Sequence, residues 1–198
     1  HGSQSHKADI PIQLLAQQAQ QQGYQVLSFD LPQHGDRVGT SRPCQPPFYV
    51  EDAKQVLRYA KSRWQEVSLF ANSLGAYVAL LAYHQEPLHH AWFLSPLLNM
   101  ERMIQNMMTW FQITPQQLEA QGAIPTPIGE TLVWDYYRYA NTHPIIHWPI
   151  PTHILYGAED TLCEKEMVQQ FSQQFHCQLQ IVPSEHYFHT PQQLQLLT

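Results

Sequence analysis

Apolar and polar positions along the chain follow two alternating patterns, one typical of helices and the other typical of buried strands. Apolar residues spaced three and four apart predict helices at Ile10–Gln22, Val50–Trp64, Leu74–Gln85, Lys165–Phe175 and from Thr190 onward. Short apolar runs between them favour strands at Tyr24–Phe29, Glu66–Ala71, His90–Leu94, Thr152–Tyr156 and Gln178–Val182. Strands that alternate with helices predict an α/β fold, with a mostly parallel sheet covered by helices on both faces.

The alternation stops between Leu97 and Pro149. Helical pieces follow one another there with no strand between them, at Met100–Phe111, Pro115–Gln121 and Gly129–Ala140. We therefore predict one domain over residues 1–198 that carries a helical insertion over residues 97–149. Functional side chains are expected at the carboxyl ends of the strands, where parallel α/β sheets carry their sites.

A serine stands at the end of the second predicted strand, in the run Ala71-Asn72-Ser73-Leu74-Gly75. A strand, a serine and a helix follow one another here, with small residues two positions to either side of Ser73. A nucleophile on so sharp a turn needs small neighbours, because the strand and the helix crowd it. The amides that begin the helix point at the same place, where they stabilise developing negative charge. The alternative is a serine that only caps a helix.

Two later strands end in residues that could serve such a serine. Gly157 closes one strand, with Glu159 and Asp160 after it, and His186 follows the last strand. A serine hydroxyl needs an adjacent base, histidine titrates near the working pH, and a carboxylate orients the imidazole. Taken singly, the acid could cap a helix and the histidine could be solvated. Taken together, the order Ser, Asp, His is that of one type of catalytic triad, in which Asp160 fits the position of the acid better than Glu159.

On these motifs the chain resembles the α/β-hydrolase superfamily over essentially all of its 198 residues. His1–Lys7 is similar to the HG-x oxyanion loop of that family, and Phe29–Arg37 is similar to its D-x-P-G-H-G loop. Ala71–Gly75 resembles the nucleophile elbow, Gly157–Asp160 resembles the acid loop, and Glu185–Phe188 resembles the histidine loop.

The resemblance implies a role for each of these side chains. Ser73 would be the nucleophile, His186 the base and Asp160 the orienting acid. The backbone amides of Leu74 and Ser3 would form the oxyanion hole, in which a single donor is typically worth about 10²–10³ in rate. No metal and no organic cofactor is implied.

Residues 97–149 lie where the family places its cap. An apolar stripe in this region is expected either to be the buried side of a helix or to form the wall of an acyl-binding pocket. Its candidate pocket residues are Met103, Met107, Trp110 and Trp134.

The chain also departs from the family pattern. Ala71 stands where the elbow has its first glycine, and Gln33 stands where the D-x-P-G-H-G loop has a glycine. The sequence opens at the oxyanion loop, whereas family members have strands before it. A protein that began at His1 would lack one strand of the sheet.

We therefore expect a serine hydrolase, similar to carboxylesterases, that cleaves a small to medium acyl ester through an acyl-enzyme intermediate. Its expected partner is a small-molecule acyl substrate. A thioesterase or an aminopeptidase would use the same triad, and a non-catalytic binding protein could share the fold. An aminopeptidase would need a carboxylate for the amine of its substrate, and the candidates are Glu101, Glu119, Glu130 and Asp135.

Composition and charge narrow the class further. The net charge is −6 and the pI about 6.0, so no basic face is offered to nucleic acid or to an anionic membrane. No apolar run reaches the roughly 18 residues of a membrane span. The three scattered cysteines predict neither a disulfide framework nor a zinc site, and Cys163 is expected to be an inert core thiol. His186 and His189 lack a third ligand, so no metal is expected. The absence of a disulfide framework makes a reducing cytoplasm the expected location.

Overall fold

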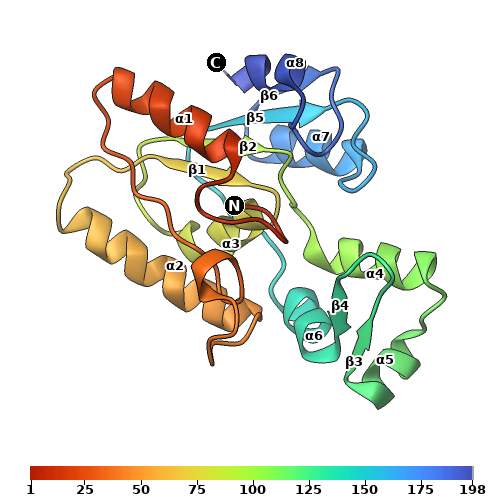
Figure 1. Ribbon diagram of the computed structural model, residues 1–198. Helices are drawn as coiled ribbons and strands as arrows, with labels where there is room; N and C mark the ends of the chain where they lie inside the picture. The colour runs from red at the N-terminus through yellow and green to blue at the C-terminus, as the bar shows by residue number, and fades with distance from the viewer. Residues whose placement is uncertain (198) are drawn as a thin grey trace. The chain divides into compact units, whose positions relative to one another are not determined.

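A four-stranded parallel sheet lies in the larger of two compact units of this chain (Figure 1). The computed structural model describes residues 1–197, and it divides them into His1–Leu98 with the residues from His147 on, and Asn99–Ile146. The strand order is β1-β2-β5-β6, and every neighbouring pair is parallel. The strands are β1 (Leu69–Asn72), β2 (Ala91–Leu94), β5 (Thr152–Gly157) and β6 (Gln178–Val182). Four of the five predicted strands are thereby confirmed.

Helices cover both faces of this sheet, as the sequence pattern predicts. α1 and α8 lie on one face and α2 and α3 on the other, while α7 packs against β6 (Figure 1). These helices are α1 (Ile10–Gln21), α2 (Pro46–Lys61), α3 (Leu74–Tyr83), α7 (Lys165–Gln174) and α8 (Pro191–Leu194), the last continued by the 3-10 helix η2 (Gln195–Leu197). α3 is apolar on nearly all sides, and only two of its ten residues are not buried. Within residues 1–197, no helix is both long and apolar enough to cross a membrane.

The fifth predicted strand, Tyr24–Phe29, is wrong. The segment pairs with no strand, and its Tyr24, Val26 and Leu27 side chains are 52%, 40% and 43% exposed. β1 pairs on one side only, with β2, so it is an edge strand among the described residues. A strand forms only where a neighbour takes up its backbone hydrogen bonds. Here a cavity separates Tyr24–Phe29 from β1.

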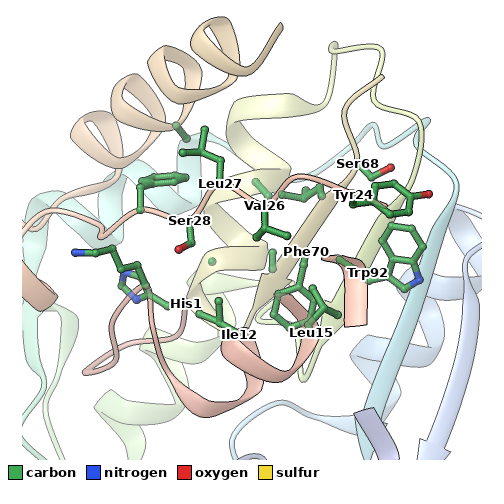
Figure 2. A pocket seen from close by; sticks show the side chains of 18 of the residues that line it. His1, Ile12, Leu15, Tyr24, Val26, Leu27, Ser28, Ser68, Phe70 and Trp92 are labelled. Atoms are coloured by element: carbon green, nitrogen blue, oxygen red, sulfur yellow. The ribbon is translucent and has the colours of Figure 1, made fainter. Parts of the chain in front are cut away.

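This cavity has a volume of about 400 Å³ and a mostly apolar lining (Figure 2). The segment Tyr24–Phe29 lines it together with Leu69 and Phe70 of β1 and with Ile12 and Leu15 of α1. Figure 2 shows Val26, Phe70 and Ile12 around this space. Leu69 and Phe70 are only partly buried. Apolar residues that the sequence pattern assigns to a buried sheet therefore face a cavity instead of one another.

The smaller unit, Asn99–Ile146, combines helices with a β-hairpin. The prediction of a stretch without strands is wrong here, because β3 and β4 pair antiparallel where the third helix of the insertion was expected to begin. Gly129 has a φ of +81°, and the Thr126 amide donates to the Glu130 carbonyl, so the chain turns back at this point. The elements are α4 (Met100–Trp110), α5 (Pro115–Gln121), β3 (Ala123–Pro125), β4 (Thr131–Val133) and α6 (Trp134–Thr142).

Candidate active site

Ser73 stands at the sharp turn between β1 and α3. Its φ of 49° lies in the left-handed region that residues other than glycine rarely adopt, which indicates a turn held in place by its surroundings. The Ser73 amide donates to the Leu94 carbonyl at 3.0 Å, and the Ser73 carbonyl accepts from the Leu97 amide at 3.2 Å. A Cβ on Gly75 would lie 2.8 Å from the carbonyl oxygen of His1. The small residue two positions after the serine thus makes room for the first residues of the chain.

Three side chains from separate strand ends meet at this turn. His186 Nε2 lies 3.0 Å from Ser73 Oγ, and His186 Nδ1 lies 2.7 Å from Asp160 Oδ2. The His186 side chain is 6% exposed and that of Asp160 is fully buried. Beside a carboxylate, Nδ1 carries the ring proton and donates it, which leaves the Nε2 lone pair free to accept the Ser73 hydroxyl proton. The structure thus brings together the three side chains that the sequence singled out.

Backbone amides fix the carboxylate of Asp160. Its Oδ1 accepts hydrogen bonds from the Leu162 amide at 2.8 Å and the Cys163 amide at 2.9 Å, which leaves Oδ2 for His186. Glu159, the other acid of this loop, is exposed. The histidine therefore pairs with Asp160 and not with Glu159.

The loops that carry Asp160 and His186 pack backbone against backbone. The Glu159 amide donates to the Ser184 carbonyl at 2.9 Å. Gly157 leaves no room between the loops, because a Cβ there would lie 2.3 Å from the Ser184 carbonyl oxygen. A side chain at this position would push the acid loop and the histidine loop apart.

The two predicted oxyanion-hole residues adjoin or approach Ser73. Leu74 is the buried first residue of α3, so its amide lies at the amino end of that helix, next to the serine. The loop that carries Ser3 reaches the same turn, since a Cβ on Gly2 would lie 3.4 Å from Ser73 Cβ. A joint role of the two amides in holding an oxyanion stays a prediction.

A buried carboxylate, Asp30, anchors the far end of the loop that carries Ser3. Its Oδ1 accepts from the Lys7 amide at 2.7 Å, and its Oδ2 accepts from the Lys7 ammonium at 2.7 Å and the Asp36 amide at 3.1 Å. Gly35 has a φ of +51°, and a Cβ there would lie 2.3 Å from Asp30 Oδ1. In the sequence, Asp30 stands in a family motif, but the motif does not show what its side chain does. Gly35 in the same loop is the signal that could have indicated a tightly packed group there.

Asp30→Asn should lower the free energy of unfolding at pH 7 by about 1–3 kcal/mol, because it removes a charged acceptor from three donors. Burial alone would raise the pKa of Asp30, but hydrogen bonds from Lys7 and Asp36 outweigh it and hold the pKa below its usual value. The charge therefore stabilises the fold above the unfolded-state pKa of about 4, and this contribution is lost as the pH falls. Urea unfolding should show a difference in the free energy of unfolding between wild type and variant at pH 7, and this difference should be smaller at pH 3.

Asp36→Asn is the matched control for this measurement. The Asp36 carboxylate also pairs with Lys7, but its side chain is 84% exposed. Its loss should change the free energy of unfolding by less than about 0.5 kcal/mol. If Asp30→Asn and wild type differed in free energy of unfolding by the same amount at both pH values, the role given to the Asp30 charge would be contradicted.

Cys163 lies beside the paired acid and histidine. Its Sγ, a carboxylate oxygen of Asp160 and a ring nitrogen of His186 all lie within 4.8 Å of one another. Cys163 is buried, and burial together with the charge of Asp160 raises the pKa of the thiol, which is therefore protonated at neutral pH. The sequence places Cys163 three residues after Asp160, but its closeness to His186 arises only from the packing of the two loops.

The four predicted pocket residues all belong to the smaller unit. Met107 is buried, Trp110 is 47% exposed, and Met103 and Trp134 are partly buried. Within this unit α4, which carries Met103, Met107 and Trp110, packs against α6, which begins at Trp134. A role of these side chains in a substrate pocket stays a prediction.

The comparisons with known proteins agree with this fold. The model of the alpha/beta hydrolase family matches residues 1–194. Est1E from Butyrivibrio proteoclasticus has a TM-score of 0.81 at 21% identity, over 100% of this chain and 81% of Est1E. Mouse alpha/beta hydrolase domain-containing protein 10 has a TM-score of 0.77 at 17% identity, over 99% and 83% of the two chains. The Pyrococcus furiosus esterase Pf2001 has a TM-score of 0.67 at 21% identity, over 94% and 72%.

None of the curated protein sequences matches the chain. The parallel sheet, its helices on both faces and the strand–serine–helix turn define the class of fold. Together with the family model, they identify the chain: it belongs to the alpha/beta hydrolase family. The resemblance seen in the sequence is thereby confirmed.

Proposed function

We propose that this protein is a serine hydrolase that cleaves carboxylic esters of small to medium acyl groups. The observation that carries the proposal is the line of contacts from Ser73 Oγ to His186 Nε2, at 3.0 Å, and from His186 Nδ1 to Asp160 Oδ2, at 2.7 Å. A serine hydroxyl within hydrogen-bond reach of a base, itself oriented by a third group, is the signature of an activated nucleophile.

In the proposed reaction His186 Nε2 takes the hydroxyl proton while Ser73 Oγ attacks the ester carbonyl. The backbone amides of Leu74 and Ser3 hold the resulting oxyanion. His186 then returns the proton to the leaving alcohol, and the acyl group remains on Ser73. A water molecule, deprotonated by His186, releases the acid and restores the hydroxyl. Asp160 stays ionised throughout and stabilises the imidazolium.

The names of proteins with the same fold support an ester as the substrate. One is an esterase of Pyrococcus furiosus, one is a monoacylglycerol lipase of Paleococcus ferrophilus, and Est1E has been solved with ferulic acid bound. An expected small acyl pocket formed by Met103, Met107, Trp110 and Trp134 is part of the same proposal. A thioesterase or an aminopeptidase remains the alternative, because each would use the same three side chains.

Ser73→Ala should lower kcat for p-nitrophenyl butyrate by about 10⁴-fold or more, because no other group replaces the nucleophile. A series from acetate to octanoate, measured on wild type, gives the preferred acyl length. A fluorophosphonate probe should label the wild type and leave Ser73→Ala unlabelled.

Ser95→Ala is the matched control, because Ser95 also follows a sheet strand, has a positive φ and is fully buried. Its hydroxyl has no hydrogen-bond partner among the described residues, so its removal should change kcat by less than about twofold. Folded wild-type protein that neither hydrolyses the esters nor reacts with the probe would reject the proposed function. Equal rates for Ser73→Ala and wild type would reject Ser73 as the nucleophile.

A further inference from the structure

Three different donor atoms lie close together at the proposed catalytic triad. They are a carboxylate oxygen of Asp160, Sγ of Cys163 and a ring nitrogen of His186, and each lies within 4.8 Å of the other two. Residues 1–197 hold no other group of three or more such side chains that could share a metal ion. Oxygen, sulfur and nitrogen donors of these kinds form the usual ligand set of Zn²⁺ and its thiophilic neighbours.

The spacing is close to what a tetrahedral ion needs. Zinc bonds of 2.0–2.3 Å place neighbouring ligand atoms about 3.3–3.6 Å apart. Asp160 Oδ2 and His186 Nδ1 start closer than this, at 2.7 Å. Cys163 Sγ lies within 4.8 Å of a carboxylate oxygen of Asp160 and of a ring nitrogen of His186. Shifts of about 1 Å, within the reach of side-chain rotation, would bring all three to an ion.

The backbone around these ligands is already fixed. The Cys163 amide donates to Asp160 Oδ1 at 2.9 Å, and the Cys163 carbonyl accepts from the Tyr156 hydroxyl at 2.7 Å. Cys163 is 6% exposed, and its thiol has no part in the proposed hydrolysis. The backbone of the site therefore needs little ordering before an ion can bind, but the hydrogen bond between Asp160 and His186 must break.

We propose that Zn²⁺ and similar thiophilic divalent cations bind to Asp160, Cys163 and His186 and thereby inhibit the enzyme. The inhibitory consequence rests on the proposed function, whereas the binding does not. The Cys163 thiol releases its proton to solvent and binds as thiolate. The His186 ring proton moves from Nδ1 to Nε2, so that Nδ1 can bind the ion. A ring that carries its proton on Nε2 cannot accept the Ser73 hydroxyl proton, so metal binding and catalysis exclude each other.

Because metal binding and catalysis exclude each other, the bound ion would be an inhibitor and not a cofactor of the reaction. His186 Nδ1 cannot both bind an ion through its lone pair and donate the hydrogen bond to Asp160 that orients the base. Occupancy switches the enzyme off, and a chelator should switch it back on.

The first test measures inhibition of p-nitrophenyl butyrate hydrolysis by ZnCl₂, with recovery after addition of EDTA. Cys163→Ala keeps the backbone amide that holds Asp160, so it should stay active without zinc, and its inhibition is compared with its own zinc-free rate. It should raise the zinc concentration for half-inhibition by at least about 100-fold, because even the loss of an outer partner of a metal ligand weakens binding 10–100-fold. Magnesium, which prefers oxygen ligands, should not inhibit either protein.

Cys44→Ala and Cys177→Ala are matched controls, since Cys44 is exposed and Cys177 is only partly buried. Both variants should be inhibited by zinc like the wild type. The chain has 12 histidines, so zinc binding alone would not identify this site. Equal inhibition of wild type and Cys163→Ala would overturn the proposal.

The second test does not depend on activity. CdCl₂ is titrated into Ser73→Ala, and the ultraviolet charge-transfer band of a cadmium–thiolate bond is recorded. The band should appear as the first equivalent binds, and the part of it that depends on Cys163 should be missing from Ser73→Ala combined with Cys163→Ala. If the band appears but the wild type hydrolyses no ester, the proposed function fails and the metal site stands. If Ser73→Ala gives no band that depends on Cys163, the metal site fails whatever the activity.

Discussion

Asp160→Asn should lower kcat for ester hydrolysis by about 10⁴-fold, although the two side chains have nearly the same size and shape. The amides of Leu162 and Cys163 both donate to Oδ1, so they select the oxygen of the new carboxamide. Its NH₂ group then faces His186 Nδ1 and needs an acceptor there. The ring proton moves to Nε2, and the histidine can no longer accept the Ser73 proton.

The measurement is kcat and KM for p-nitrophenyl butyrate, together with a thermal unfolding curve. The loss should fall on kcat, with KM changed by less than about threefold, because the carboxylate orients the base and does not bind substrate. Glu159→Gln alters the neighbouring, exposed acid and should leave both constants near wild type. A large loss with Glu159→Gln and a small one with Asp160→Asn would reverse the assignment of the acid.

Gly157→Ala should lower the free energy of unfolding by about 3 kcal/mol or more, the upper range for a group forced into a packed interior. The added Cβ would lie 2.3 Å from the Ser184 carbonyl oxygen and 2.4 Å from that of Glu185. Both atoms belong to the backbone, so no side-chain rotation can relieve the contact. The loop that carries His186 must move instead, and kcat should fall together with stability.

Gly39→Ala serves as the control, because a Cβ there would meet no atom within 4 Å. Its φ of +76° still disfavours alanine, so a loss of about 1 kcal/mol is expected with unchanged kcat. Urea unfolding of both variants and of the wild type gives the comparison. A Gly157→Ala protein as stable and active as wild type would mean that the two loops separate freely.

The sequence predicted those parts of the fold in which local pattern and tertiary environment agree. Ala91–Leu94 and Gln178–Val182 are predicted as strands and do find partners in the sheet. Tyr24–Phe29 has the same pattern but no partner, and pairing cannot be deduced from one strand alone. The sequence pattern does not predict the hairpin of the smaller unit, because it places the start of a helix at Gly129, whereas the positive φ of this residue belongs to a turn.

The candidate site also has features that can be predicted from the sequence and features that cannot. Ser73, Asp160 and His186 could be predicted, because a parallel sheet brings its strand ends to one edge and each residue follows such an end. The Asp30–Lys7 pair and the closeness of Cys163 to His186 could not, since both join segments that only the packing of loops brings together. Sequence spacing holds information on neighbours along a strand or helix, but not on contacts between loops.

The cavity beside β1 also bears on how copies of this chain behave at high concentration. Tyr24–Phe29 contains no charged residue, and its Tyr24, Val26 and Leu27 side chains are exposed. Natural sheet edges are usually protected from one another by charges, above all by lysine. Without such protection, an apolar extended segment next to an edge strand is a template for intermolecular β-structure. Tyr24–Phe29 is therefore the segment of the described residues that we expect to pair between copies of this chain on heating.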